Sequence, residues 1–199
     1  MDGLRERKKE HTREAIEHVA IRLFTERGYE ATPIEAICEA VLVSRRTFFR
    51  YFTSKEDVVL SRSRRAYALA VDELAQRPAD EPYRDAVRAV FTRAGALFTE
   101  DRAGQLQRVR LLTEVPALAG PFLNLLGEFE LLLGGFLADR SGRERDEPRV
   151  RLAAAAATTS FRVAAEIWRD RAGEPDLAAL AADNLDTLLP DQLLADENR

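Results

Sequence analysis

A thirteen-residue stretch near the N-terminus gathers side chains that could bind a polyanion. Residues 43–55 include three arginines, one lysine, two serines, two threonines, one tyrosine and three phenylalanines. On a helix from about Ser44 to Tyr51, Phe48 and Phe52 are four residues apart and share one side. The arginines fall on other sides. A helix that is apolar behind and cationic in front suits the DNA major groove, which is wide enough to admit one helix.

One longer helix upstream is expected to support this stretch. Residues 8–27 carry apolar side chains at a spacing of three and four, with charged residues opposite. Gly28 follows, at the position where glycine commonly ends a helix. Residues 2–10 lack apolar periodicity, so we expect them to be disordered.

A second, short helix should precede the basic one. Thr32 is the expected cap, Pro33 suits the first helical position, and Glu35 completes a capping box. This helix should end near Val41, and Ser44 is then the natural N-cap of the next. Two short helices joined by a tight turn, the second basic, indicate a helix-turn-helix.

The rest of the chain is helical in pattern, and no strand signal competes. We predict an all-α protein of about nine helices, with a DNA-binding domain at 1–53 and a helical regulatory and dimerisation domain at 54–199. The later helices are expected at 54–76 (a connector), 83–99, 102–115, 118–139, 149–171 and 176–189. The tail from Pro190 is expected to fray.

Composition narrows the function classes. Residues 1–65 carry 14 Lys and Arg against 11 Asp and Glu, whereas the remainder carries 16 against 23, so a mildly basic head precedes an acidic body. Cys38 is the one cysteine and is expected in the core. With only His11 and His18 besides, we predict no metal site and no cofactor. The sequence shows no signal peptide and no long apolar run, which indicates a cytoplasmic protein without a membrane partner.

Residues 10–60 resemble the TetR family of bacterial transcriptional regulators. The resemblance is carried by Gly28-Tyr29-Glu30-Ala31-Thr32, by Ile34-x-x-Ile37, and by Val43-Ser44-Arg45-Arg46-Thr47-Phe48-Phe49-Arg50-Tyr51-Phe52-x-Ser54-Lys55-Glu56. It implies a homodimer whose two basic helices enter successive major grooves of an inverted-repeat operator.

The resemblance also implies which side chains meet DNA. The DNA-facing positions are Arg45, Arg46, Thr47, Phe49 and Tyr51, and Arg50 lies on the cationic side of the same helix. The phosphate-binding positions are Thr32, Ser44 and Lys55, which stand at helix starts. Phe49 and Tyr51 could instead serve packing.

One departure from the family pattern concerns the turn. The family usually has glycine where this chain has Leu42. A positive φ at a residue with a Cβ costs about 1–2 kcal/mol. Either the turn adopts another backbone or the head is slightly strained.

The resemblance further implies that small molecules bind inside the helical body. Polar residues on its apolar helices need partners when buried, and a hydrophobic or amphipathic ligand could supply them. The candidate lining residues are Arg110, Glu114, Phe122, Asn124, Leu126, Phe129, Thr158, Phe161, Arg162 and Trp168. The alternative is that the polar groups pair with one another or face water. Trp168 could equally line a dimer interface or simply pack.

The two last helices suit dimerisation, because small residues let helices approach closely and two helices per subunit would form a four-helix interface. The alternative is that Ala153 to Ala157 pack only within the subunit. The leading hypothesis is a repressor released from DNA by a ligand. The alternatives are an effector-independent regulator and an all-helical enzyme or carrier, for which only scattered carboxylates such as Glu128 and Glu166 could act.

Overall fold

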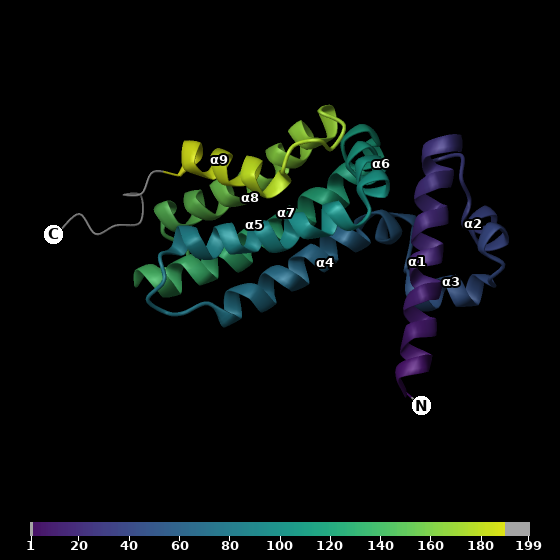
Figure 1. The fold of residues 1–199 in the computed structure, drawn as a ribbon, viewed down its shortest axis with the longest axis horizontal. Helices are drawn as coiled ribbons and strands as arrows, with labels where there is room; N and C mark the ends of the chain where they lie inside the picture. Colours follow the sequence, from purple (N-terminus) through teal and green to yellow (C-terminus); the bar gives the residue numbers. More distant parts are fainter. Residues whose placement is uncertain (1, 190–199) are drawn as a thin grey trace. The chain divides into compact units, whose positions relative to one another are not determined.

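The computed structural model describes residues 2–189, and this part of the chain forms nine α-helices and no strand. Figure 1 shows their order. The helices are α1 (Asp2–Arg27), α2 (Ile34–Val41), α3 (Arg45–Tyr51), α4 (Lys55–Gln76), α5 (Tyr83–Glu100), α6 (Arg102–Glu114), α7 (Pro116–Ser141), α8 (Pro148–Asp170) and α9 (Leu177–Leu188). The all-α expectation is confirmed. The predicted fraying of the tail from Pro190 lies outside the described residues.

The chain divides into two compact units, and the division differs from the expected one after Thr53. The first unit contains the residues up to Ser61 together with Ala103–Pro121. The second contains Arg62–Arg102 and the described residues from Phe122 onward. The difference arises because most of α6 and the first turns of α4 pack with the helix-turn-helix.

Helix α1 is longer than predicted. It begins at Asp2, so the expected disorder of residues 2–10 is wrong. Its later turns bury Ile16, Ala20 and Phe24, as the spacing predicted. Gly28 ends the helix with a φ of 91°, a value that glycine adopts without the steric cost that a Cβ would add.

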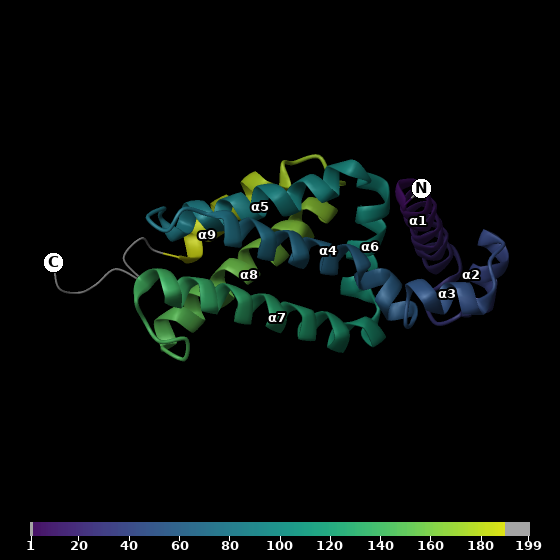
Figure 2. The same cartoon turned by 90° about the horizontal axis from the view of Figure 1, so that it is seen from below.

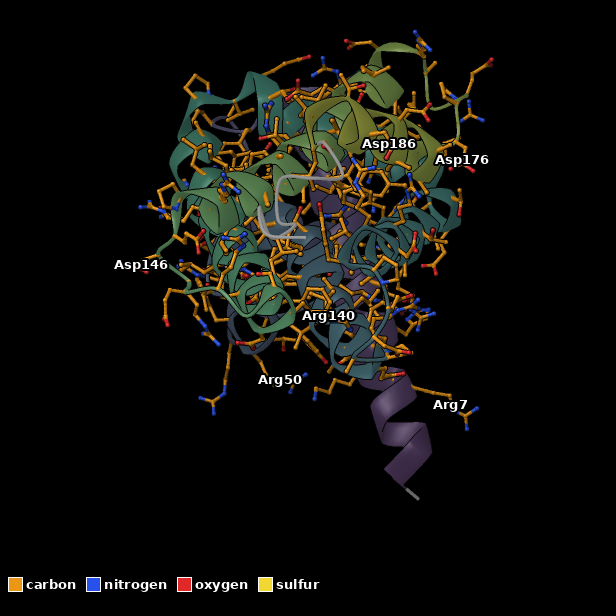
Figure 3. The ribbon with its side chains drawn as sticks, turned by 90° about the vertical axis from the view of Figure 1, so that its left-hand side faces the viewer. Arg7, Arg50, Arg140, Asp146, Asp176 and Asp186 are labelled. Carbon is orange, nitrogen blue, oxygen red and sulfur yellow. The ribbon has the colours of Figure 1, made fainter. Side chains whose placement is uncertain are left out.

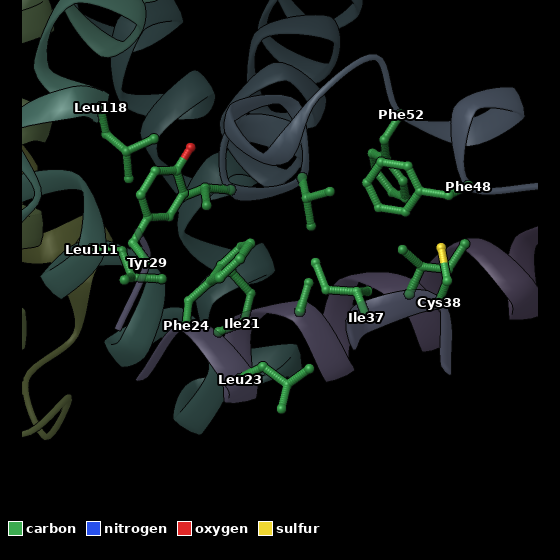
Figure 4. Close-up of a cluster of buried hydrophobic side chains, with 14 residues drawn as sticks. Ile21, Leu23, Phe24, Tyr29, Ile37, Cys38, Phe48, Phe52, Leu111 and Leu118 are labelled. Atoms are coloured by element: carbon green, nitrogen blue, oxygen red, sulfur yellow. The ribbon is translucent and has the colours of Figure 1, made fainter. Parts of the chain in front are cut away.

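An apolar cluster holds the first unit together (Figure 4). Phe48 and Phe52 are fully buried in it with their ring centroids 5.9 Å apart, as the sequence predicted. Leu111 from α6 and Leu118 from α7 join the same cluster near Tyr29. The core around the helix-turn-helix is therefore completed by residues of α6 and α7, which lie far along the chain from it.

In the second unit, α9 packs along α8 and α5 (Figure 2). Arg84 and Arg88 of α5 both reach Asp186 of α9, at 3.3 and 2.7 Å. Asn184 of α9 donates its side-chain N–H to the carbonyl oxygen of Ser160 at 3.1 Å. These polar contacts fix α9 against its two neighbours.

Helix α7 combines buried and exposed apolar positions. Leu125, Leu133 and Leu137 are buried, whereas Leu123 and Leu131 are exposed. By length and composition alone α7 could cross a membrane, since an 18-residue window has a mean hydropathy of 1.3, with 33% of the window buried. A core helix of a water-soluble protein meets the same criteria, so the absence of a membrane partner stays a prediction.

Candidate nucleic-acid interface

The basic helix α3 begins as the sequence predicted. Ser44 is its N-cap, with extended backbone (φ −77°, ψ 157°), and its hydroxyl oxygen accepts the Thr47 N–H at 3.1 Å. The Thr47 hydroxyl lies 2.9 Å from the same oxygen. An N-cap of this kind satisfies one of the free N–H groups at a helix start. The remaining N–H groups lie beside two exposed arginines, which is a suitable place for a phosphate.

The aromatic residues of α3 divide between the core and the surface. Phe49 is 46% exposed, and its ring contacts the buried Phe48 ring edge to face, with centroids 5.4 Å apart. Tyr51 is half-buried and packs on the core cluster, so it has a packing role whatever else it contacts. Phe49 is thus a surface residue held in place by a buried one.

The three arginines of α3 differ in how they are held. Arg45 Nη1 lies 2.5 Å from Glu35 Oε1 of α2, and its guanidinium lies 5.8 Å from the centre of the Phe49 ring. Arg50 donates to the Tyr51 hydroxyl at 3.2 Å and stacks over that ring at 5.0 Å. Arg50 is exposed, and its side chain is labelled in Figure 3. Arg46 is exposed, and no ion pair holds it among residues 2–189.

The turn between α2 and α3 has a left-handed backbone at Leu42, where the family usually has glycine. Leu42 is left-handed, with φ 59° and ψ 44°, and 93% of its surface is exposed. The backbone N–H groups of Leu42 and Val43 still bond the carbonyl oxygens of Glu39 and Cys38, at 3.2 and 2.9 Å. The turn therefore keeps the geometry that favours glycine, and the leucine side chain contributes no burial to offset the strain.

Two of the predicted phosphate ligands have other partners. Thr32 does not cap α2, which begins at Ile34 after Pro33; its side chain is fully buried and donates to the carbonyl oxygen of Gly28 at 2.8 Å. Lys55 donates to the carbonyl oxygens of Tyr29 and Thr32, at 2.8 and 3.1 Å. Both side chains close the loop between α1 and α2, because its carbonyl groups have no helical partner. The Thr32 side chain is therefore buried away from the surface, whereas the Lys55 ammonium has three N–H donors and keeps one besides these two bonds. The phosphate contacts of both residues stay predictions.

The start of α4 carries a carboxylate in a favourable setting. Burial acts to raise the pKa of Glu56, but the nearby Ser54 side chain, its own backbone and the Tyr29 side chain favour the charged form more strongly, so the pKa is lowered. The pKa of the Tyr29 hydroxyl is raised, chiefly by burial and then by the Glu56 charge. At neutral pH Glu56 is therefore ionised and the Tyr29 hydroxyl is protonated.

Cys38 is buried on α2, as expected for a small core residue. Burial raises the pKa of its thiol, and a thiol that stays protonated is a poor nucleophile. Among the residues that the structure describes, no three His, Cys, Asp or Glu side chains gather where they could hold a metal ion.

Sequence reasoning missed two residues that organise this unit. Arg108 of α6 is only 4% exposed. It donates from Nη1 to the Val58 carbonyl oxygen at 3.0 Å and from Nη2 to Glu17 at 3.2 Å. A signal was present, since Glu17 falls beside Ile16 on the apolar side of its helix, but a sequence pattern does not reveal its partner ninety-one positions away.

In the second unit, several predicted ligand-binding residues belong to one aromatic cluster. Phe161 lies 5.6 Å from Phe91 and 5.9 Å from Phe98, and Phe98 lies 5.3 Å from Trp168. Phe129, like Phe98 and Phe161, packs against the buried Ala66, Ala94 and Leu97, and its ring lies edge-on to Tyr67 with centroids 5.0 Å apart. On the same helix as Phe161, the buried Thr158 hydroxyl has no hydrogen-bond partner in the described part of the chain.

The other predicted lining residues do not join that cluster. Arg110 and Glu114 are exposed and belong to the first unit. Asn124 is exposed on α7, and Arg162 pairs with Glu166 of its own helix at 2.6 Å. Their inclusion in one ligand site stays a prediction. Phe122 and Leu126 are half-buried on α7.

The fold and the basic helix define a class: an all-helical protein with a helix-turn-helix head. Residues 16–61 match the model of bacterial regulatory proteins of the tetR family, and residues 81–192 match the MftR C-terminal domain. The chain is 36% identical to the HTH-type transcriptional regulator TcmR of Streptomyces glaucescens over 207 residues, covering 99% of this chain and 91% of TcmR. It is 26% identical to a putative mycofactocin biosynthesis transcriptional regulator, MftR, of Mycobacterium tuberculosis, over 68% of this chain and 69% of that one.

Among solved structures, FadR of Thermus thermophilus, a TetR family transcriptional repressor in complex with lauroyl-CoA, superimposes with a TM-score of 0.64. The two are 25% identical, and the match covers 94% of this chain and 98% of FadR. The chain therefore belongs to the TetR family and is a DNA-binding transcriptional regulator, not an enzyme.

Proposed function

We propose that this protein is a cytoplasmic homodimeric repressor that leaves an inverted-repeat operator when a small hydrophobic or amphipathic ligand binds its body. The observation that carries the proposal is the surface of α3. A buried phenylalanine pair anchors this helix, and Arg45, Arg46 and Arg50 stand exposed on it. Arginine bonds bidentately to guanine in the major groove and also contacts phosphates, so this surface can provide both specificity and affinity.

The proposed dimer forms through α8 and α9. Much of the alanine run is used inside the subunit, where Ala153, Ala154 and Ala157 are buried. The outer side of these helices still carries exposed Leu152 and Leu188. Burying exposed leucines against a second copy is favourable, since apolar burial contributes about 25 cal/mol per Å². The dimer places two α3 helices so that they read two half-sites related by symmetry.

The proposed ligand site includes the aromatic cluster of Phe98, Phe129, Phe161 and Trp168 together with Thr158. Apolar walls and one unpartnered hydroxyl suit a ligand that is largely hydrophobic and carries a hydrogen-bonding group. FadR of Thermus thermophilus was solved with lauroyl-CoA, a ligand of this class. The bound lauroyl-CoA in FadR supports a ligand of the amphipathic class for this chain.

Release would be a shift in population between two spacings of the α3 helices. One spacing matches the interval of about 34–36 Å between successive major grooves. A ligand that binds another spacing more tightly lowers operator affinity by its differential affinity for the two states.

The test begins with selection of bound sequences from a random DNA pool by the purified protein. We expect an inverted repeat, bound by a dimer, with an affinity that falls steeply as salt rises because phosphate contacts release counterions. Acyl-CoA and aromatic compounds are then added to the complex. Release by one of them supports the repressor mechanism, whereas unchanged binding across the panel favours the alternative, an effector-independent regulator. A failure to enrich any sequence would contradict the proposal as a whole.

A further inference from the structure

We propose that Glu35 is a positioning residue for DNA recognition, which orients Arg45 so that α2 and α3 together determine one base of each half-site. The proposal rests on DNA binding by α3, and it assigns a role to an acidic residue on the DNA-binding side of the head.

Arg45 is held from two sides. The Glu35 carboxylate lies 2.5 Å from Nη1, and the Phe49 ring lies under the guanidinium at 5.8 Å. Phe49 is itself fixed by its edge contact with the buried Phe48. Glu35 is in the first turn of α2, where the helix dipole stabilises a negative charge. Arg45 is in the first turn of α3, where the helix dipole destabilises a positive charge. The ion pair with Glu35 therefore restricts the Arg45 side chain to one orientation.

This orientation leaves a defined set of donors. Because Glu35 takes Nη1, the Nη2 and Nε–H groups remain as a two-donor edge. Two parallel donors in one plane match the O6 and N7 acceptors of guanine. An arginine that is already oriented loses less side-chain freedom on binding, and the preference for that base rises accordingly.

Arg46 provides the contrast within the same helix. It is exposed, and no ion pair in residues 2–189 fixes it. A mobile guanidinium suits a phosphate, which accepts a bond from many directions. The Glu35 carboxylate also repels nearby phosphates, so it should weaken binding to DNA of any sequence while sharpening the choice of base.

The experiment compares wild type with E35Q, R45A, R46A and a matched control, E39Q. Glu39 is an exposed acid on the same helix, and no ion pair joins it to Arg45 in the described structure. Each variant is used in selection from the random pool and then in titration of the wild-type operator and all single-base variants of one half-site, at several salt concentrations.

We expect R45A to lose discrimination at one position of each half-site, by about 5- to 150-fold. E35Q should lose part of the discrimination at that same position and bind unrelated DNA more tightly. E39Q should strengthen binding to all sequences without changing the base preference. R46A should weaken binding uniformly and reduce the salt slope by about 1.

The proposal is overturned if E35Q keeps the wild-type preference at the position that R45A affects. It is also overturned if E35Q alters a different position, because Glu35 would then read a cytosine amino group itself. Thermal unfolding of E35Q and E39Q side by side separates a folding defect from a recognition defect, since only the former lowers the melting temperature. If wild type itself enriches no sequence, the proposed function fails and not this inference alone.

Discussion

Arg108 on α6 donates to Glu17 on α1 across 3.2 Å, and both side chains are buried. The same guanidinium bonds the carbonyl oxygens of Val58 and Val59 and the Ser61 hydroxyl, at 3.0, 3.4 and 3.4 Å. One side chain thus connects α6 to α1 and to the first turns of α4. Since residues 103–121 enter the first unit from a distant part of the sequence, this ion pair fastens the inserted segment to the DNA-binding head.

Replacing Arg108 by methionine should lower the free energy of unfolding by about 3–5 kcal/mol, because the Glu17 carboxylate loses its buried cationic partner and keeps the partly exposed Arg13. The double variant R108M/E17L should recover much of that loss, since the buried carboxylate is removed together with its buried partner. Urea denaturation measures both. The matched control is R22A, which removes an exposed i,i+4 pair with Glu26 and should cost less than about 0.5 kcal/mol. Equal losses in R108M and R22A would refute a structural role for the buried pair.

Replacing Leu42 by glycine should stabilise the protein. The left-handed backbone destabilises the folded state by about 1–2 kcal/mol at a residue with a Cβ, and glycine removes this strain. Glycine also gives the unfolded chain more conformational freedom, which offsets about 0.5–1 kcal/mol of the gain. We expect a net gain of roughly 0.5–1 kcal/mol by urea denaturation. Gly28 is the converse control: its φ is 91° and an added Cβ would meet nothing within 4 Å, so G28A should destabilise through backbone strain alone. A loss of stability in L42G would show that the leucine side chain has a contact beyond its own turn.

Replacing Thr32 by valine should lower stability by about 1–3 kcal/mol, because the carbonyl oxygens of Gly28 and Leu23 lose a buried donor. Operator affinity of the folded variant should stay within about threefold of wild type, since the side chain is fully buried. Ser44→Ala is the comparison, because its hydroxyl is exposed at the start of α3. Fluorescence anisotropy with the selected operator checks both. A large loss of affinity in a stable T32V protein would support the phosphate role.

Replacing Glu56 by glutamine should reduce stability in a pH-dependent way. The pKa of Glu56 is lowered in the folded state, so its ionised form contributes stability that is present above the ordinary carboxyl pKa of 4.5 and is lost as the pH falls through the folded value. The difference between wild type and E56Q should therefore be constant from about pH 6 to 8 and shrink below about pH 4.5. Urea denaturation at each pH gives the comparison, and a constant difference down to pH 3 would contradict the assignment.

Local patterns in the sequence were enough to predict most of the DNA-binding head. Capping by Ser44, burial of Phe48 and Phe52, and the end of α1 at Gly28 each depend on residues within a few positions of one another. The family resemblance covered the same region. The start of α2 was misplaced because Thr32 bonds backward to the loop after α1, and a capping-box pattern does not reveal that competition.

The sequence by itself determined the all-helical class, the basic character of α3 and the burial of Phe48 and Phe52, because periodicity and charge patterning act over short distances. It left two backbones open at Leu42, and the structure decided for the left-handed one. Only the tertiary structure decided which distant residues meet. It placed Arg108 against Glu17 and Glu35 against Arg45, and it left Arg110, Glu114 and Asn124 exposed. The physical reason is that a polar residue on a helix can be satisfied by water, by its own helix or by a remote partner, and only the packing of the helices selects among the three.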